Sequence, residues 1–105
     1  MGWIYLIVAG FFEIAWAIGL KFTHSFSRLW PTVGVVITMI LSVYFLSLAI
    51  KSIPVGTAYA VWTGIGIAGT SVLGILLFNE SASVARILLI LLIFLSIIGL
   101  KLIPQ

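Results

Sequence analysis

Four long apolar runs, separated by short polar stretches, make up almost the whole chain. The runs cover approximately residues 3–20, 32–50, 55–78 and 86–103. Each is close to the ~20 residues that an α-helix needs to cross a hydrocarbon core about 30 Å thick. The pattern therefore predicts an all-α integral membrane protein with a single four-helix transmembrane domain over residues 1–105. It leaves no segment for a water-soluble domain.

Composition indicates that lipid is the solvent of this domain. Hydrophobic residues make up 64% of the 105 residues and charged residues only 7%, with a mean hydropathy of +1.42. Soluble domains are nearer half apolar and a quarter charged, and so short a chain has too small an interior to bury this much apolar surface. A soluble enzyme and a disordered tail are therefore excluded. The absence of cysteine also excludes a disulfide-stabilised scaffold.

The five Lys and Arg residues, in a chain of net charge +3, are spread along the sequence. We interpret them as membrane-flanking charges and exclude nucleic acid as a partner. Four spans place the amino terminus, Lys51 and Lys101 on one side of the membrane. The other side receives Lys21, Arg28 and Arg86, so the positive-inside rule favours neither orientation. Two explanations stay open: a small protein simply has few charges, or the chain inserts both ways and pairs with its inverted copy.

Glu13 is the only acidic residue deep within a predicted span, and no Lys or Arg lies at comparable depth. Ionisable groups at such depth are costly and usually face a protein interior or an aqueous cavity. A protonated glutamate that merely joins helices by hydrogen bonding is the alternative, but glutamine or serine would do this with less desolvation. Apolar surroundings bring proton exchange of a carboxyl group within the physiological range. A group that holds either a proton or a cation is the minimum chemistry of proton-coupled cation transport.

Residues near Glu13 in sequence or in depth extend the candidate site. Trp16 lies one turn after Glu13 and Gly10 one turn before it, on the same helical face. An aromatic ring beside an unpaired acid can hold a cation, and Gly10 gives room for a ligand or, more commonly, for close helix packing. Ser42 lies at similar depth in the second run. Its hydroxyl either bonds to its own helix or orients one carboxyl oxygen.

The third run combines aromatic residues with glycines. Tyr59 and Trp62 are three residues apart and share a helical face. Gly64 and Gly66 follow directly and weaken the helix, so we predict a hinge there. Bent or broken membrane helices are common in transporters. Close helix packing is the alternative explanation for the same glycines.

No motif indicates enzyme catalysis or cofactor binding. His24 is the only histidine and lies in a predicted loop, so a metal site is not expected. The sequence has no nucleophile–base pair and no phosphate-binding loop. We therefore predict that the protein is not an enzyme and uses no cofactor.

These features together resemble the small multidrug resistance (SMR) transporters over essentially the whole chain. The resemblance rests on the central Glu13 with its following aromatic residue and on the third-span stretch 54–66, PVGTAYAVWTGIG. The stretches 16–21 (WAIGLK), 51–54 (KSIP), 62–66 (WTGIG) and 99–101 (GLK) are similar to the guanidinium-exporter (Gdx) branch rather than to the quaternary-ammonium branch.

The resemblance implies an antiparallel, dual-topology homodimer in the plasma (inner) membrane of a prokaryote. Spans one to three would line a shared chamber, and the fourth spans would join the two copies. The implied roles are substrate and proton binding by Glu13, an aromatic lining of Trp16, Tyr59 and Trp62, a supporting hydroxyl at Ser42, a small lining residue at Gly10, a kink at Gly64 and Gly66, and a basic residue of unassigned role at Lys101.

The expected function is proton-coupled antiport. Guanidinium and small guanidinyl cations are exported by alternating access, while protons compete with them for the paired Glu13. The forked N–H donors of guanidinium suit carboxylate oxygens. Two alternatives stay open. A broader exporter of quaternary ammonium or other hydrophobic cations would rely on cation–π contact, and a structural or proton-carrying subunit of a larger membrane complex would transport nothing alone.

Overall fold

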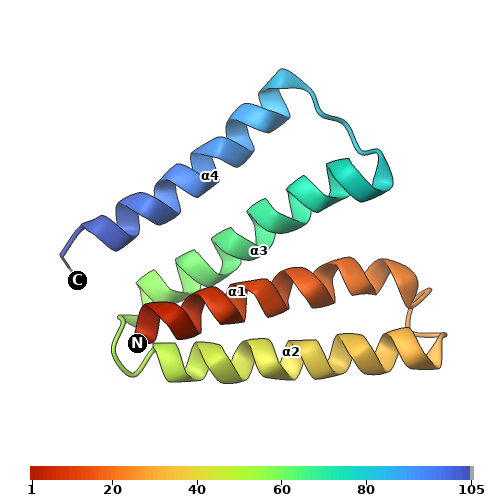
Figure 1. The fold of residues 1–105 in the computed structure, drawn as a ribbon, viewed down its shortest axis with the longest axis horizontal. Coiled ribbons are helices and arrows are strands. Elements are labelled where there is room, and N and C mark those ends of the chain that lie inside the picture. Colours follow the sequence, from red (N-terminus) through yellow and green to blue (C-terminus); the bar gives the residue numbers. More distant parts are fainter. Residues whose placement is uncertain (105) are drawn as a thin grey trace.

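The computed structural model describes residues 1–104, which form four long helices joined by short connections (Figure 1). The elements are α1 (Gly2–Gly19), a 3-10 turn η1 (Leu20–Phe22), α2 (Leu29–Ala49), α3 (Val55–Phe78) and α4 (Val84–Leu102). Each of the four long helices, α1 together with η1, is long and apolar enough to cross a membrane. The described part of the chain contains no strand. The prediction of an all-helical protein with four spans is therefore confirmed.

Two helices begin earlier than the apolar pattern suggests. α2 begins at Leu29 and includes Pro31 in its first turn, where a missing N–H removes no helical hydrogen bond. α4 begins at Val84 rather than at Arg86. The side chain of Ser83 caps this helix by accepting a hydrogen bond of 3.2 Å from the backbone N–H of Arg86.

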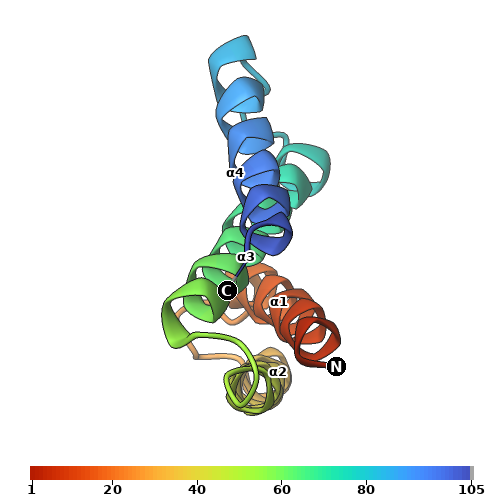
Figure 2. The ribbon, with the colours of Figure 1, turned by 90° about the vertical axis from the view of Figure 1, so that its left-hand side faces the viewer.

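The helices form an open layer instead of a closed bundle. α1 packs between α2 and α3, and α4 packs along α3, with a side-chain contact to α1 between Lys101 and Trp3. The order across the layer is thus α2–α1–α3–α4 (Figures 1 and 2). The principal extents of 44 × 35 × 16 Å describe a slab. Both termini and the α2–α3 connection lie at one end of this slab, and the other two connections lie at the opposite end (Figure 1).

The tightest packing lies at the end that holds the termini. There α1, the end of α2, the α2–α3 connection and the start of α3 contribute a cluster of buried apolar residues, namely Leu6, Ala49, Ile53, Ala58 and Val61. α4, in contrast, buries only Ile90. Many large apolar side chains of the protein are exposed. Such a surface is stable where lipid or another chain covers it.

Close approach between α1 and α3 depends on small residues. A Cβ atom at Gly10 would lie 2.8 Å from the Cβ atom of Ile65, much closer than van der Waals contact allows. On α2, in contrast, a Cβ atom at Gly34 would meet nothing within 4 Å. Gly10 is therefore required by the packing of two helices, whereas Gly34 is not.

We expect Gly10→Ala to destabilise the protein by roughly 1–3 kcal/mol, as overpacking of a close-packed interior does. The Cβ atom of Ile65 is fixed to its own backbone, so α1 and α3 must separate to admit the new methyl group. Gly34→Ala is the matched control, and its free energy of unfolding is expected to equal that of the wild type. Reversible unfolding in mixed micelles, followed by circular dichroism, measures both. Equal stability of the two variants would contradict this account of the α1–α3 contact.

Candidate functional site

The candidate site lies along the seam where α1 meets α3. Residues four apart lie on one face of a helix, and two such rows face each other across this seam. They contain Glu13, Ala17 and Lys21, from α1 into η1, and Gly66, Thr70, Gly74 and Phe78 of α3. α1 and α3 run in the same direction (Figure 1). The two rows therefore remain side by side from the middle of the layer to the end opposite the termini.

Glu13 lies midway along α1, with its carboxyl group against the backbone of α3. A Cβ atom at Gly66 would collide with that carboxyl group, so the glycine lets the carboxyl group lie in this position. The Oε2 atom of Glu13 is buried and receives no hydrogen bond from residues 1–104. The one ion pair within these residues joins Arg86 to Glu80. Glu13 thus has no counter-charge in the described chain.

A cavity of about 300 Å³ adjoins this carboxyl group. Its lining consists of Glu13 and Ala17 from α1 and of Gly66, Ile67, Thr70 and Ser71 from α3. The Oγ1 atom of Thr70 is buried without a partner among the described residues, and so is the Nε1 atom of Trp16, one turn beyond Glu13. Buried polar atoms are normally paired. Two unpaired polar atoms that line one cavity, Oε2 of Glu13 and Oγ1 of Thr70, are typical of a place that receives a polar ligand or water.

Ser42 joins three helices at the inner end of the seam. It is fully buried, and its Oγ atom donates a hydrogen bond of 2.7 Å to the carbonyl oxygen of Ala9 on α1. The same atom accepts a hydrogen bond of 2.8 Å from Nε1 of Trp62 on α3. The hydroxyl therefore bonds neither to its own helix nor to Glu13. It fixes Trp62 and the turn of α1 that precedes the glutamate.

The other predicted site residues are distributed around this seam. The ring of Tyr59 lies 5.5 Å from the ring of Trp62, and the side chain of Tyr59 is 57% exposed. Gly10 packs against α3 and does not line the Glu13 cavity. The Nζ atom of Lys101 lies 5.9 Å from the ring centroid of Trp3, which is within cation–π range. Lys101 is therefore placed at the end of the layer that holds the termini.

The predicted hinge residues are part of one continuous helix, since α3 runs unbroken through Gly64 and Gly66. They face different neighbours. Gly66 lies against the carboxyl group of Glu13, and a Cβ atom at Gly64 would lie 3.1 Å from Cδ1 of Ile97 on α4. Both glycines thus permit close packing, and bending at this point stays a prediction.

Sequence reasoning did not identify Ala17, Thr70 and Ser71 as lining residues. A signal was available, because Ala17 lies four residues after Glu13 and Thr70 lies four residues after Gly66. Hydroxyl side chains in membrane helices usually bond to their own backbone, so Thr70 and Ser71 do not stand out in the sequence as site residues.

Known proteins resemble this chain over nearly its full length. Residues 1–93 match the family model described as Small Multidrug Resistance protein. A protein of Yersinia pseudotuberculosis named "Guanidinium exporter" is 59% identical over 102 residues, which cover 97% of this chain and 98% of the relative. Relatives of the same name from Salmonella typhimurium and Citrobacter freundii are 56% and 57% identical over 102 residues, with 97% of each chain covered.

We expect Ser42→Ala to destabilise the protein by about 1–3 kcal/mol, because it leaves the indole N–H of Trp62 without a partner in a largely buried place. Ser47→Ala is the matched control on the same helix, since the hydroxyl of Ser47 is exposed and bonds only to the carbonyl oxygen of Tyr44. Unfolding in mixed micelles is expected to show a loss of stability for Ser42→Ala alone. If the two variants are equally stable, the hydroxyl of Ser42 does not hold the three helices together.

Proposed function

The chain belongs to the Small Multidrug Resistance family, and from this membership we propose that it exports guanidinium and small guanidinyl cations in exchange for protons. It is a transporter rather than an enzyme, and a multi-pass protein of the prokaryotic inner membrane. The observation that carries the proposal is Glu13. Its carboxyl group lies mid-membrane beside a cavity, with neither a counter-charge nor a hydrogen-bond donor among the described residues.

The chemistry of this carboxyl group favours guanidinium as the cation. Guanidinium is planar, and its forked N–H donors match the two oxygens of a carboxylate. A quaternary ammonium ion has no such donors and would have to rely on aromatic faces, such as the pair formed by Tyr59 and Trp62. Because the relatives at 56–59% identity are named for guanidinium export, this cation class is the first choice.

In this proposal the working unit is an antiparallel homodimer, in which two Glu13 carboxyl groups face one chamber. The open layer supports it, because α4 packs mainly on α3 and most of its apolar surface stays exposed for another partner. The distribution of charge supports it as well. Lys51 and Lys101 lie at the end of the layer that holds the amino terminus, and Lys21, Arg28 and Arg86 lie at the other. Neither orientation is therefore preferred.

Exchange follows from competition for the same carboxyl groups. Protons from outside neutralise the Glu13 pair and release the cation outward, while cation binding at the inner face favours proton loss. Access must then alternate between the two sides. Gly64 and Gly66 are suited to that change, because α3 meets α4 at one and α1 at the other. Bending of α3 there would alter both contacts at once.

Guanidinium flux in proteoliposomes tests the proposal. Under an imposed pH gradient, wild-type protein is expected to drive guanidinium transport, and Glu13→Gln is expected to reduce it to the background of protein-free vesicles, because glutamine keeps the shape but holds neither proton nor cation. Glu13→Asp retains a carboxyl group and is expected to keep slower, still proton-coupled exchange. Ser47→Ala should transport like the wild type.

The outcomes separate the alternatives. Gradient-driven exchange that persists in Glu13→Gln would disprove the mechanism. Transport of tetramethylammonium in preference to guanidinium would indicate a broader exporter of hydrophobic cations. If the folded wild type carries neither cation, the protein is better explained as a subunit of a larger complex.

Dual topology is tested separately with single cysteines, since the natural chain has none. Ser52→Cys, in the exposed α2–α3 connection, leaves every charge unchanged. If the chain inserts both ways, a membrane-impermeant maleimide applied to intact cells is expected to label about half of these cysteines, and the rest only after permeabilisation. Ser27→Cys, at the opposite end, should also be about half labelled. Complete labelling of one cysteine and none of the other would establish a single orientation.

A further inference from the structure

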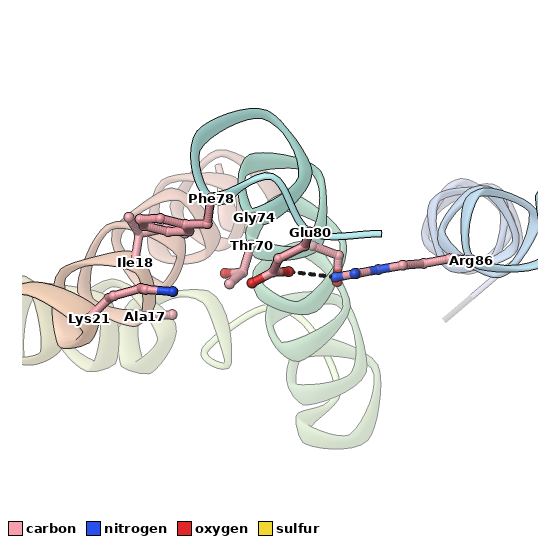
Figure 3. Close-up of a pocket in the computed structure, with 9 residues that line it drawn as sticks. Ala17, Ile18, Lys21, Thr70, Gly74, Phe78, Glu80 and Arg86 are labelled. Atoms are coloured by element: carbon pink, nitrogen blue, oxygen red, sulfur yellow. Dashed lines mark hydrogen bonds and ion pairs between the residues drawn. The ribbon is translucent and has the colours of Figure 1, made fainter. Parts of the chain in front are cut away.

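The seam continues beyond the Glu13 cavity to the end of the layer. A second cavity of about 290 Å³ adjoins the first, and the two share Ala17, Thr70 and Ser71 as lining residues. The further residues of its lining are Ile18, Lys21, Gly74, Phe78, Glu80 and Arg86 (Figure 3). Lining side chains thus run without interruption from Glu13 to the α3–α4 connection. We call this outer end of the path the mouth, defined by Lys21, Phe78, Glu80 and Arg86.

The mouth already binds a guanidinium group, that of Arg86. Its Nη2 atom donates a hydrogen bond of 2.7 Å to Oε1 of Glu80, and its Nη1 atom donates one of 3.2 Å to the carbonyl oxygen of Ser81. Two nitrogens of one planar group therefore meet two separate acceptors. The sequence contains two acidic residues, so Glu13 and Glu80 are its only acidic side chains, one within the path and one at its mouth.

The backbone directs Glu80 toward the path. Asn79 ends α3 in a left-handed conformation with φ of 53°, and the N–H of Glu80 then donates a hydrogen bond of 3.3 Å to the carbonyl oxygen of Gly74. A Cβ atom at Gly74 would collide with the Glu80 carboxyl group. Figure 3 shows this carboxyl group lying between Arg86 and the wall of α3. The carboxyl group thus lines the cavity while it stays partly exposed to solvent.

The second basic residue of the mouth does not neutralise Glu80. The Nζ atom of Lys21 lies 4.4 Å from the ring centroid of Phe78, a cation–π contact, and makes no ion pair with Glu80. Arg86 is thus the one cation paired with this carboxylate. The pair is half-exposed, with 33% of the Arg86 side chain and 41% of the Glu80 side chain accessible. Exposed ion pairs contribute little stability, so a competing cation can replace one member.

We propose that Glu80 and the carbonyl oxygen of Ser81 form an outer binding site for guanidinium cations, which Arg86 occupies as a built-in competitor with the same head group. This inference rests on the proposed function, because it makes the mouth a second binding site for the same substrate. A guanidinium cation that passes between Glu13 and the membrane surface takes over the two acceptors of Arg86. A quaternary ammonium ion has no N–H donors and cannot do so.

The two arginines of the chain, Arg28 and Arg86, allow this exchange to be observed directly. Nitrogen-15 NMR of arginine side chains is recorded on Glu13→Gln protein, which lacks the inner site, and Arg28→Gln in that background assigns the signals. Millimolar guanidinium chloride is expected to shift the Arg86 signal saturably and to leave that of Arg28 unchanged. Equal tetramethylammonium chloride is expected to shift neither. An Arg86 signal that responds equally to both salts, or to neither, overturns the outer site whether or not the protein transports guanidinium.

Transport kinetics provide the second test. Arg86→Gln is expected to lower the KM for guanidinium roughly two- to fivefold, the fold-change that corresponds to the loss of one weak ion pair, with the maximal rate little changed. Glu80→Gln is expected to raise the KM for guanidinium by a similar factor. Arg86→Lys keeps the positive charge but lacks the forked N–H donors of a guanidinium group, and its KM is expected to lie between those of Arg86→Gln and the wild type. Arg28→Gln, a charge removed at the same end of the layer, should leave KM unchanged.

The double variant separates a binding site from a general effect of charge. Glu80 supplies the only charge for which Arg86 and the substrate compete in this inference, so Glu80→Gln combined with Arg86→Gln is expected to match Glu80→Gln closely. Additive changes in KM, or unchanged KM in both single variants, would overturn the outer site while leaving guanidinium export intact. Failure of the wild type to transport guanidinium would instead overturn the proposed function.

Discussion

A single carboxyl group in the middle of an apolar layer is the constraint on which this structure depends. An ionisable group at that depth is costly, and it persists only where the neighbouring helix approaches without displacing it. Gly66 meets this requirement by presenting backbone to Glu13, where any Cβ atom would collide. The nearby hydroxyl of Thr70 is polar but carries no charge. The surroundings therefore admit a proton or a cation without neutralising the acid in advance.

The two ends of the α1–α3 seam are built differently, so Glu13 is accessible from one end of the layer and not from the other. Toward the termini, buried apolar side chains and the hydroxyl of Ser42 close the seam. Toward the other end, two adjoining cavities lead from Glu13 to the α3–α4 connection. One copy of the chain thus has one accessible end. In the proposed inverted pair, two identical copies would be accessible from opposite sides, so alternating access requires that the two copies adopt different conformations in turn.

The sequence was sufficient to predict the four helices, because an apolar run of span length has no other stable backbone arrangement in lipid. It also identified Glu13, because a lone acid among apolar residues is conspicuous. The partners of Ser42 were not predictable, since a serine in a membrane helix bonds locally by default and these bonds depend on how three helices meet. From the sequence alone, Glu80 is an ordinary charged residue in the connection between the third and fourth spans. Only the left-handed end of α3 at Asn79 turns it over the cavity.

Glu13 and Glu80 lie at two depths of the layer and have different roles in the proposed exchange. In the proposed exchange Glu13 couples the flows, because an unpaired carboxyl group holds a proton or a cation but not both, and any fixed counter-charge would abolish that competition. An unpaired acid at the mouth would attract every passing cation. The guanidinium group of Arg86 on Glu80 restricts replacement to cations whose N–H donors satisfy the same acceptors. In the two proposals together, selection by hydrogen-bond geometry at the mouth therefore precedes coupling by charge at Glu13.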